Sequence, residues 1–173
     1  MFLSDYAGCN GNNLPWNATF GGPGNGMILS QTAGTSSGGG IVTRNVVRPT
    51  DVTDGLAYTL MLAEKAADPA APTPGITNED DVSYAAGYNF ANLNAIRFTN
   101  PTLLPMRDTD FTLVSGKASP SGGAFGSIHP GVFNALMGDG SVLALSYTIS
   151  PNIYAAIGSI KGHEIVSDVD LYP

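Results

Sequence analysis

Two short apolar runs separated by a Gly-Asp-Gly turn most constrain the fold of this chain. The runs are residues 133–137 and 142–147, and the turn occupies 138–140. Glycine and aspartate accept the tight backbone conformations that connect two antiparallel strands. The pattern therefore predicts a β-hairpin in which Phe133 pairs with Leu145.

His129 lies just before this hairpin, and together with Asp139 it invites a catalytic or metal-binding interpretation. Hairpin geometry argues against a direct pair. A strand advances about 3.3 Å per residue, so the two side chains should lie more than about 13 Å apart, whereas proton transfer needs about 3 Å. We expect structural roles instead: a type II turn at His129-Pro130-Gly131, with the histidine bonded to nearby backbone, and a hairpin turn at Asp139-Gly140. A site that His129 forms with a distant residue, Glu64 or His163, stays open.

Glycine and proline shape the rest of the chain, which has 22 Gly and 12 Pro among 173 residues. Helices tolerate both residues poorly, so this composition favours strands, tight turns and long loops. The predicted fold class is α+β and β-rich, with an antiparallel sheet, short helices and long Gly/Pro-rich loops. We expect one domain over residues 1–173.

Local signals predict further elements. Residues 41–47 and 58–64 are expected to be strands, and residues 164–166 a short last strand. Ser150-Pro151 should begin a helix over 152–157 that Gly158 ends.

The charge pattern excludes some partners. The net charge is −7, with seven Lys and Arg, and only 12% of the residues are charged. Such a chain has no basic stripe for nucleic acid, no polybasic patch for anionic lipid and no apolar run near the ~18–20 residues that span a bilayer. A composition poor in charge and rich in Gly, Asn, Ser and Thr suits an extracytoplasmic protein.

Cys9 is the single cysteine, which excludes an intrachain disulfide. We expect it to be a small buried hydrophobe.

Enzymatic and metal motifs are weak. Ser127 and His129 are only two positions apart, and the chain has no Gly-x-Ser-x-Gly elbow for a serine hydrolase. Two His and one Cys lack the ligand spacing of a zinc site. We expect no cofactor, with calcium as the open alternative, because two pairs of carboxylates stand at alternate positions. These pairs are Asp108 with Asp110 and Asp168 with Asp170.

Four segments, in this order, resemble the DUF1559 family of prepilin-like proteins, which carry an H-x9-DG motif and are abundant in planctomycetes. The segments are 5–8, 52–65, 125–142 and 149–167, so the resemblance reaches from end to end. The motif residues that the resemblance implies are Asp54, Gly55, Glu64, His129, Pro130, Gly131, Asn134, Asp139 and Gly140.

The resemblance implies an extracytoplasmic head domain, similar to those of type IV pilins and type II secretion pseudopilins. It also implies a prepilin helix upstream of the residues given, and that helix would be the only contact with a membrane. Members of the family have no established enzymatic activity. We therefore expect a non-enzymatic structural or assembly protein of the cell surface or a secretion system, with protein partners or self-assembly. One face of its sheet should be apolar and open to a helix.

Two other functions stay open. The first is an extracellular module that binds a glycan or a larger protein complex, possible because Trp16, Tyr84, Tyr88 and Phe90 fall in predicted loops and could stack on sugar rings. The second is an enzyme in which His129 or His163 meets a carboxylate in a pocket.

Overall fold

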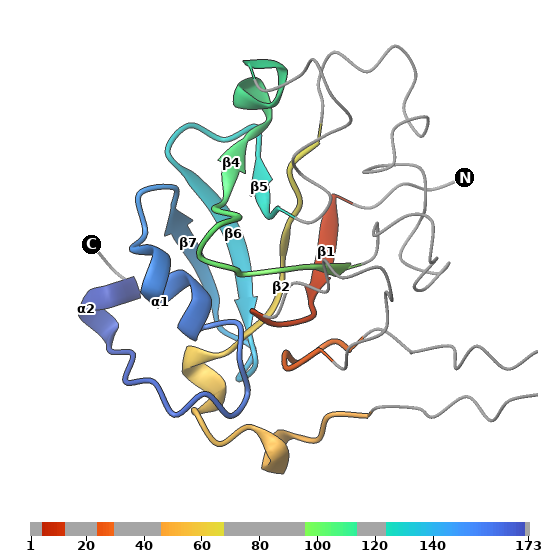
Figure 1. Cartoon of the computed structure of the whole chain (residues 1–173), viewed down its shortest axis with the longest axis vertical. Helices are drawn as coiled ribbons and strands as arrows, with labels where there is room; N and C mark the ends of the chain where they lie inside the picture. The colour runs from red at the N-terminus through yellow and green to blue at the C-terminus, as the bar shows by residue number, and fades with distance from the viewer. Residues whose placement is uncertain (1–4, 13–23, 30–45, 68–95, 114–123, 172–173) are drawn as a thin grey trace, which may run out of the picture.

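The computed structural model describes residues 5–12, 24–29, 46–67, 96–113 and 124–171 (Figure 1). The main sheet contains β1 (Tyr6–Cys9), β2 (Leu60–Glu64), β3 (Ile96–Arg97), β6 (Val132–Met137) and β7 (Val142–Ser146). A second sheet pairs β4 (Met106–Arg107) with β5 (Gly126–Ser127). The helices of the described part are short: α1 (Pro151–Ala156), α2 (Asp168–Leu171) and the 3-10 segments η1 (Pro49–Asp51), η2 (Leu56–Tyr58) and η4 (Asp108–Leu113).

The main sheet has the strand order β3-β1-β2-β6-β7. β1 with β2, β2 with β6 and β6 with β7 are antiparallel, whereas β1 with β3 and β4 with β5 are parallel. The predicted α+β, β-rich class is confirmed. The main sheet is mixed: three of its four strand pairs are antiparallel, as expected, and the pairing of β1 with β3 is parallel. Each parallel pair joins strands that are distant in the sequence, and the pattern of a single strand does not specify its neighbour.

The hairpin of β6 and β7 forms as the sequence predicts, with Phe133 opposite Leu145. The amide of Gly140 donates to the carbonyl of Met137 at 3.0 Å, and Gly140 has a φ of 90°. This arrangement is a tight turn followed by a left-handed glycine, a common three-residue hairpin loop. Asp139 has no positive φ. Its Oδ1 instead accepts bonds from the amide and hydroxyl of Ser141 at 2.9 and 2.6 Å, which lower the pKa of the carboxyl.

The Gly140→Ala variant should lose roughly 1–2 kcal/mol of unfolding free energy, because a Cβ disfavours the left-handed backbone by that amount. Nothing lies within 4 Å of the added Cβ, so the loss has no steric component. Gly140→Asn should lose less, since asparagine tolerates this region better. Thermal unfolding of the two variants checks the prediction. Equal stability of Gly140→Ala and the native chain would rule out the turn as assigned.

The core lies between the sheet and α1. Residues that alternate along β6 and β7 point to the same face, and their burial alternates accordingly. α1 covers this face with the buried ring of Tyr154, whose hydroxyl donates to the carbonyl of Phe98 at 3.2 Å. The predicted helix at 152–157 is confirmed within one residue. The buried cluster includes Ala7, Cys9, Leu60, Ala63, Phe125, Phe133, Ala135, Met137, Leu143, Leu145, Ile149, Tyr154, Ile157 and Leu171.

The opposite face of the sheet, here called the outer face, is only partly covered. Over β1, Ile28 packs against Gly8, whose missing side chain leaves the space for it. Over β2 and β6, Leu62 and Leu136 are half-buried opposite one another. At β7 the same face is open, and Val142 is 67% exposed.

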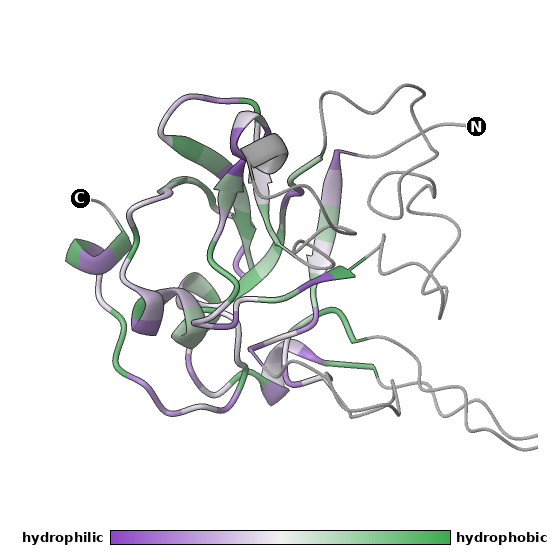
Figure 2. Ribbon diagram, turned by 45° about the horizontal axis from the view of Figure 1, so that its top comes forward, coloured by the Kyte–Doolittle hydropathy of each residue, from purple (hydrophilic) through white to green (hydrophobic). Residues whose placement is uncertain are grey.

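Two predicted strands need correction, and a third lies mostly outside the described residues. The segment 164–166 is not a strand, and Ile165 is 92% exposed. Its apolar run is too short to compete for a place in the sheet, and Figure 2 shows hydrophilic and hydrophobic residues alternating along the loop that leads to α2. The predicted strand at 58–64 begins only at Leu60, after η2. Of the predicted strand at 41–47, only residues 46 and 47 are described, and neither is in a strand.

Candidate functional site

The carboxylate of Glu64 lies where the backbone ladder between β2 and β6 ends. Ladder pairs run from Leu60 with Met137 to Ala63 with Ala135. At the next position, Glu64 Oε2 accepts the amide N–H of Asn134 at 2.7 Å, and Oε1 accepts from Asn134 Nδ2 at 3.3 Å. A side chain thus satisfies a backbone donor that would otherwise lack a partner in the sheet.

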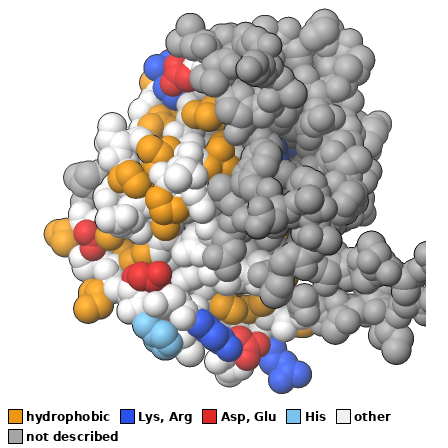
Figure 3. Space-filling view, viewed as in Figure 1, with side chains coloured by type: hydrophobic (Ala, Val, Ile, Leu, Met, Phe, Trp, Pro, Cys, Tyr) orange, Lys and Arg blue, Asp and Glu red, His pale blue; other side chains and the backbone are white. Residues whose placement is uncertain are grey.

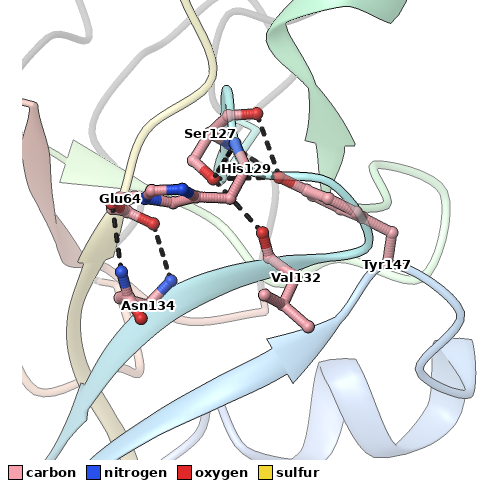
Figure 4. Close-up of polar contacts among 6 residues, drawn as sticks. All are labelled: Glu64, Ser127, His129, Val132, Asn134 and Tyr147. Carbon is pink, nitrogen blue, oxygen red and sulfur yellow. Dashed lines mark hydrogen bonds and ion pairs between the residues drawn. The ribbon is translucent and has the colours of Figure 1, made fainter.

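The imidazole of His129 reaches the same carboxylate. His129 Nε2 lies 3.3 Å from Glu64 Oε1, with the His129 side chain 49% exposed and that of Glu64 11% exposed. Figure 4 shows the ring of His129 over Glu64, with Asn134 on the other side of the carboxylate. Glu64, His129 and Asn134, here called the carboxylate cluster, come from two motif segments that are distant in the sequence, 52–65 and 125–142.

The bend before β6 is fixed by Ser127 and Tyr147. The Tyr147 hydroxyl accepts from the Ser127 amide and donates to the Ser127 carbonyl, both at 3.0 Å. Ser127 Oγ donates to the Val132 carbonyl and accepts from the His129 amide, both at 3.2 Å. The ring of Tyr147 also stacks on Phe133, with centroids 5.8 Å apart. These contacts hold the bend so that His129 turns back toward Glu64 (Figure 4).

Two tyrosines border the carboxylate cluster. Burial, followed by the nearby Glu64 and Asp5 carboxylates, raises the pKa of Tyr6. Burial also raises the pKa of Tyr147, and the charges of Asp108 and Glu64 add to the rise. Both phenols therefore stay neutral at physiological pH and act as hydrogen-bonding groups.

The chemistry of the cluster is limited by what each group contacts. A half-exposed imidazole beside a carboxylate is an acid–base pair in principle. Activation of a serine requires its hydroxyl to bond an imidazole nitrogen, whereas Ser127 Oγ bonds the main-chain amide of His129 and the carbonyl of Val132. The hydrolase arrangement is therefore absent at Ser127.

His129 and Asp139 are kept apart, as the hairpin geometry predicts. The imidazole lies at the level of Asn134, and the stretch of β6 from Asn134 to Met137 alone is roughly 10 Å long. Gly131 has a φ of 82°, which fits the expected type II turn. The expected bond from His129 to nearby backbone is formed by its amide, while its ring contacts Glu64 instead.

Asp54 organises a second polar cluster, around the loop 159–163. Its Oδ2 accepts from the Gly162 amide at 2.7 Å and the Ser159 hydroxyl at 3.1 Å, and its Oδ1 accepts from the His163 amide at 3.0 Å. These bonds hold His163 at a φ of 60°, which is unusual for a residue with a side chain. Gly55 follows with a φ of 95° and directly precedes η2. His163 thus belongs to this loop and not to the carboxylate cluster.

The described residues give no cation site. No three His, Cys, Asp or Glu side chains in the described ranges lie close enough to hold one metal ion. In η4, Asp108 Oδ1 accepts the amide of Ala67 at 3.1 Å. In α2, Asp170 accepts the amide and hydroxyl of Ser167. One carboxylate of each candidate pair therefore accepts a hydrogen bond from a backbone amide of the chain.

Sequence reasoning missed the role of Tyr147. From the sequence, Ser127 was considered only as a possible nucleophile, and Tyr147 was only the last residue of a predicted strand. The hairpin register could have indicated the tyrosine, because the Tyr147 amide donates to the Gly131 carbonyl at 3.1 Å and so places the ring beside the bend. Trp16, Tyr84, Tyr88 and Phe90 lie outside the described residues.

Cys9 is completely buried in the core, where its Sγ lies 3.9 Å from the Gly158 carbonyl. Burial raises the pKa of this thiol to about 12. At pH 8 the folded protein should therefore not react with a disulfide reagent such as DTNB, because the thiolate is the nucleophile. The thiol should react at once in 6 M guanidinium. Rapid reaction of the folded chain would contradict the burial of Cys9.

Among the described residues, no helix has the length and apolarity needed to cross a bilayer.

Comparison with known proteins places the chain in a family of sequence-related proteins. The model of the family described as "Protein of unknown function (DUF1559)" matches residues 4–152. The chain therefore belongs to the DUF1559 family. No curated protein and no solved structure matches it.

Proposed function

We propose that this chain is the head domain of a type IV pilin-like or pseudopilin-like protein, with a structural and non-enzymatic role at the cell surface or in a secretion system. The observation that carries the proposal is the outer face of the sheet. A pilin-like head needs one apolar sheet face to receive a long helix. Here Leu62 and Leu136 form a half-buried apolar strip on the outer face, and Val142 extends it toward β7.

The polar motif residues support a structural role. Glu64 bonds a strand amide, Asp54 bonds two loop amides, and Asp139 bonds the amide that follows the hairpin turn. Each carboxylate is therefore occupied by main-chain donors of its own domain. Groups used in this way stabilise backbone that is not part of a regular ladder.

Location outside the cytoplasm and assembly with other proteins belong to the same proposal. The low content of charged residues suits an extracytoplasmic domain. The apolar strip suits a protein partner or another copy, because it is only half covered at Leu62 and Leu136 and ends at Val142, which is 67% exposed.

The proposal is tested in cells that naturally produce the protein. An epitope-tagged protein should appear in the membrane fraction and in surface material released by shearing. Leu136→Lys, in the centre of the strip, should remove the protein from the sheared surface material and leave it in the membrane fraction, because the upstream helix is the membrane contact and the strip serves assembly. Ile165→Lys makes the same change on a residue that is 92% exposed and distant from the sheet, so it should leave the distribution unchanged. Recovery of the native protein only from the cytoplasm would overturn the proposal, as would normal assembly of a folded Leu136→Lys variant.

A further inference from the structure

β7 forms one edge of the main sheet. The direction of its backbone groups follows from the hairpin. The amides of Met137 and Tyr147 donate to the carbonyls of Ser141 and Gly131, which are their direct partners. Directly bonded pairs alternate along an antiparallel ladder, so Leu143 and Leu145 bond to β6. Consequently Val142, Ala144 and Ser146 direct their N–H and C=O groups away from the sheet.

This edge lacks the usual protection against pairing. Exposed edges are normally blunted by Lys, Pro, a bulge or a very short strand. β7 has five residues, Val-Leu-Ala-Leu-Ser, without charge or proline, and both Val142 and Ala144 are exposed. No backbone partner for the outward groups of Val142 and Ala144 occurs within the described ranges. The opposite edge, β3, is two residues long, and both are buried.

A cleft of about 250 Å³ adjoins this edge. It is lined by the end of β7, by α1 and by α2, including Leu145, Ile149, Ile153, Val169 and Asp170. This volume is below the roughly 300–1,000 Å³ of sites that enclose a small molecule, so it suits a side chain better. Figure 3 shows hydrophobic side chains gathered on this part of the surface, around α1 and α2.

Charge distinguishes a second copy of the chain from a different partner. Asp139 lies at one end of the edge and Asp170 at the other, and residues 132–160 and 162–171 contain no Lys or Arg. Two β7 strands paired antiparallel about Ala144 would place Asp139 of each copy opposite Ile149 of the other, on the cleft that Asp170 lines. Like charges would then meet at both ends, which is unfavourable for self-pairing.

We propose that β7 accepts an extended peptide segment of another protein as a sixth strand of the sheet. The segment is uncharged in its centre, has a Lys or Arg near each end to face Asp139 and Asp170, and places one aliphatic side chain in the cleft. Main-chain bonds to Val142 and Ala144 supply affinity, and the cleft and the acidic ends supply specificity. This inference depends on the edge of the sheet and not on the apolar strip of the outer face.

The test uses the full chain and the peptide acetyl-Lys-Thr-Val-Thr-Val-Thr-Lys-amide, with binding followed by NMR titration. We expect saturable binding, with amide NMR shifts centred on Val142 and Ala144. Methylation of the alternate peptide nitrogens that face β7 should weaken binding at least tenfold, because at least two main-chain hydrogen bonds are lost and each contributes roughly fivefold. Methylation of the remaining peptide nitrogens, which face away from β7, should change the affinity little. Replacing both peptide lysines with glutamate should also weaken binding.

On the protein, Asp170→Asn should weaken binding about two- to fivefold, the value of one exposed ion pair. Asn can still accept bonds from Ser167, so the helix end is kept. Absence of binding at millimolar peptide, or equal binding of both methylated forms, overturns the proposal. So does a dimer of the native chain in sedimentation whose NMR contacts map to β7, because a second copy is then the occupant. Failure of membrane assembly with intact peptide binding would refute only the pilin-like role.

Discussion

Glu64→Ala should lower the free energy of unfolding by about 2–3 kcal/mol. The variant removes a buried carboxylate that accepts from the amide and side chain of Asn134. Hydrogen bonds to charged groups contribute about 1.5–3 kcal/mol, and an unsatisfied donor left behind adds to the loss. His129 also loses its partner, although a half-exposed ion pair adds less than about 1 kcal/mol.

Urea denaturation at pH 7 measures this loss. Glu64→Gln should lose about half as much, since its one amide oxygen still accepts from Asn134. Glu164→Ala, on an exposed residue that accepts one 3.3 Å bond from the Ser159 hydroxyl and lies outside the carboxylate cluster, should change stability by less than about 0.5 kcal/mol. If Glu64→Ala and Glu164→Ala are equally stable, the carboxylate does not brace β2 and β6.

Asp54→Ala should cause a loss of similar size, about 2–3 kcal/mol. Three donors lose their bond to Asp54 at once: the amides of Gly162 and His163 and the hydroxyl of Ser159. The Gly162 amide keeps Ser159 Oγ as an acceptor at 3.0 Å, and the Ser159 hydroxyl keeps Glu164 Oε2 at 3.3 Å. Two of these are backbone bonds to a charged group, which is the stronger class. His163 also loses the contact that holds its left-handed backbone.

Calorimetry of Asp54→Ala and Asp54→Asn measures this effect. The asparagine variant keeps one acceptor oxygen and should lose roughly half as much stability. Amide exchange should increase at 162 and 163 in both variants and stay unchanged in the hairpin. A uniform increase over the whole chain, or no change in the melting temperature, would show that Asp54 does not organise this loop.

The local parts of the fold could be predicted from the sequence. The hairpin could be predicted because its turn residues and its alternating apolar runs both indicate the same two strands. The observed register pairs Phe133 with Leu145, as expected. α1 could be predicted because Ser150-Pro151 is a helix-start signal and Gly158 is a helix-stop signal. In both cases the information lies within about ten neighbouring residues, where turn and helix signals act.

The parts that depend on distant contacts could not be predicted. The parallel pairing of Gly8 with Ile96 depends on how a long connection returns to the sheet. The contact of His129 with Glu64 stayed one of two open alternatives, because the spacing of residues does not show which strand neighbours β6. The strand predicted at 164–166 does not form, and Ile165 is 92% exposed. Its apolar run is short, and Asp54 bonds the amides of 162 and 163 just before it.

The His-x9-Asp-Gly run therefore has two separate roles in one hairpin. Its histidine lies before β6, where it contacts the carboxylate that bonds Asn134. Its Asp-Gly pair closes the far end, through the side chain of Asp139 and the left-handed backbone of Gly140. The two ends stabilise the same hairpin without contact with one another.

Hydrogen exchange at the Asn134 amide tests the central claim, that the motif carboxylates bind backbone instead of doing chemistry. This amide has no β2 carbonyl as partner and is bonded to Glu64 Oε2 at 2.7 Å. In the native chain it should exchange as slowly as the ladder amides of β6, and in Glu64→Ala it should become selectively fast while Phe133 and Ala135 stay protected. Fast exchange of Asn134 in the native chain, or unchanged protection in Glu64→Ala, would contradict the claim.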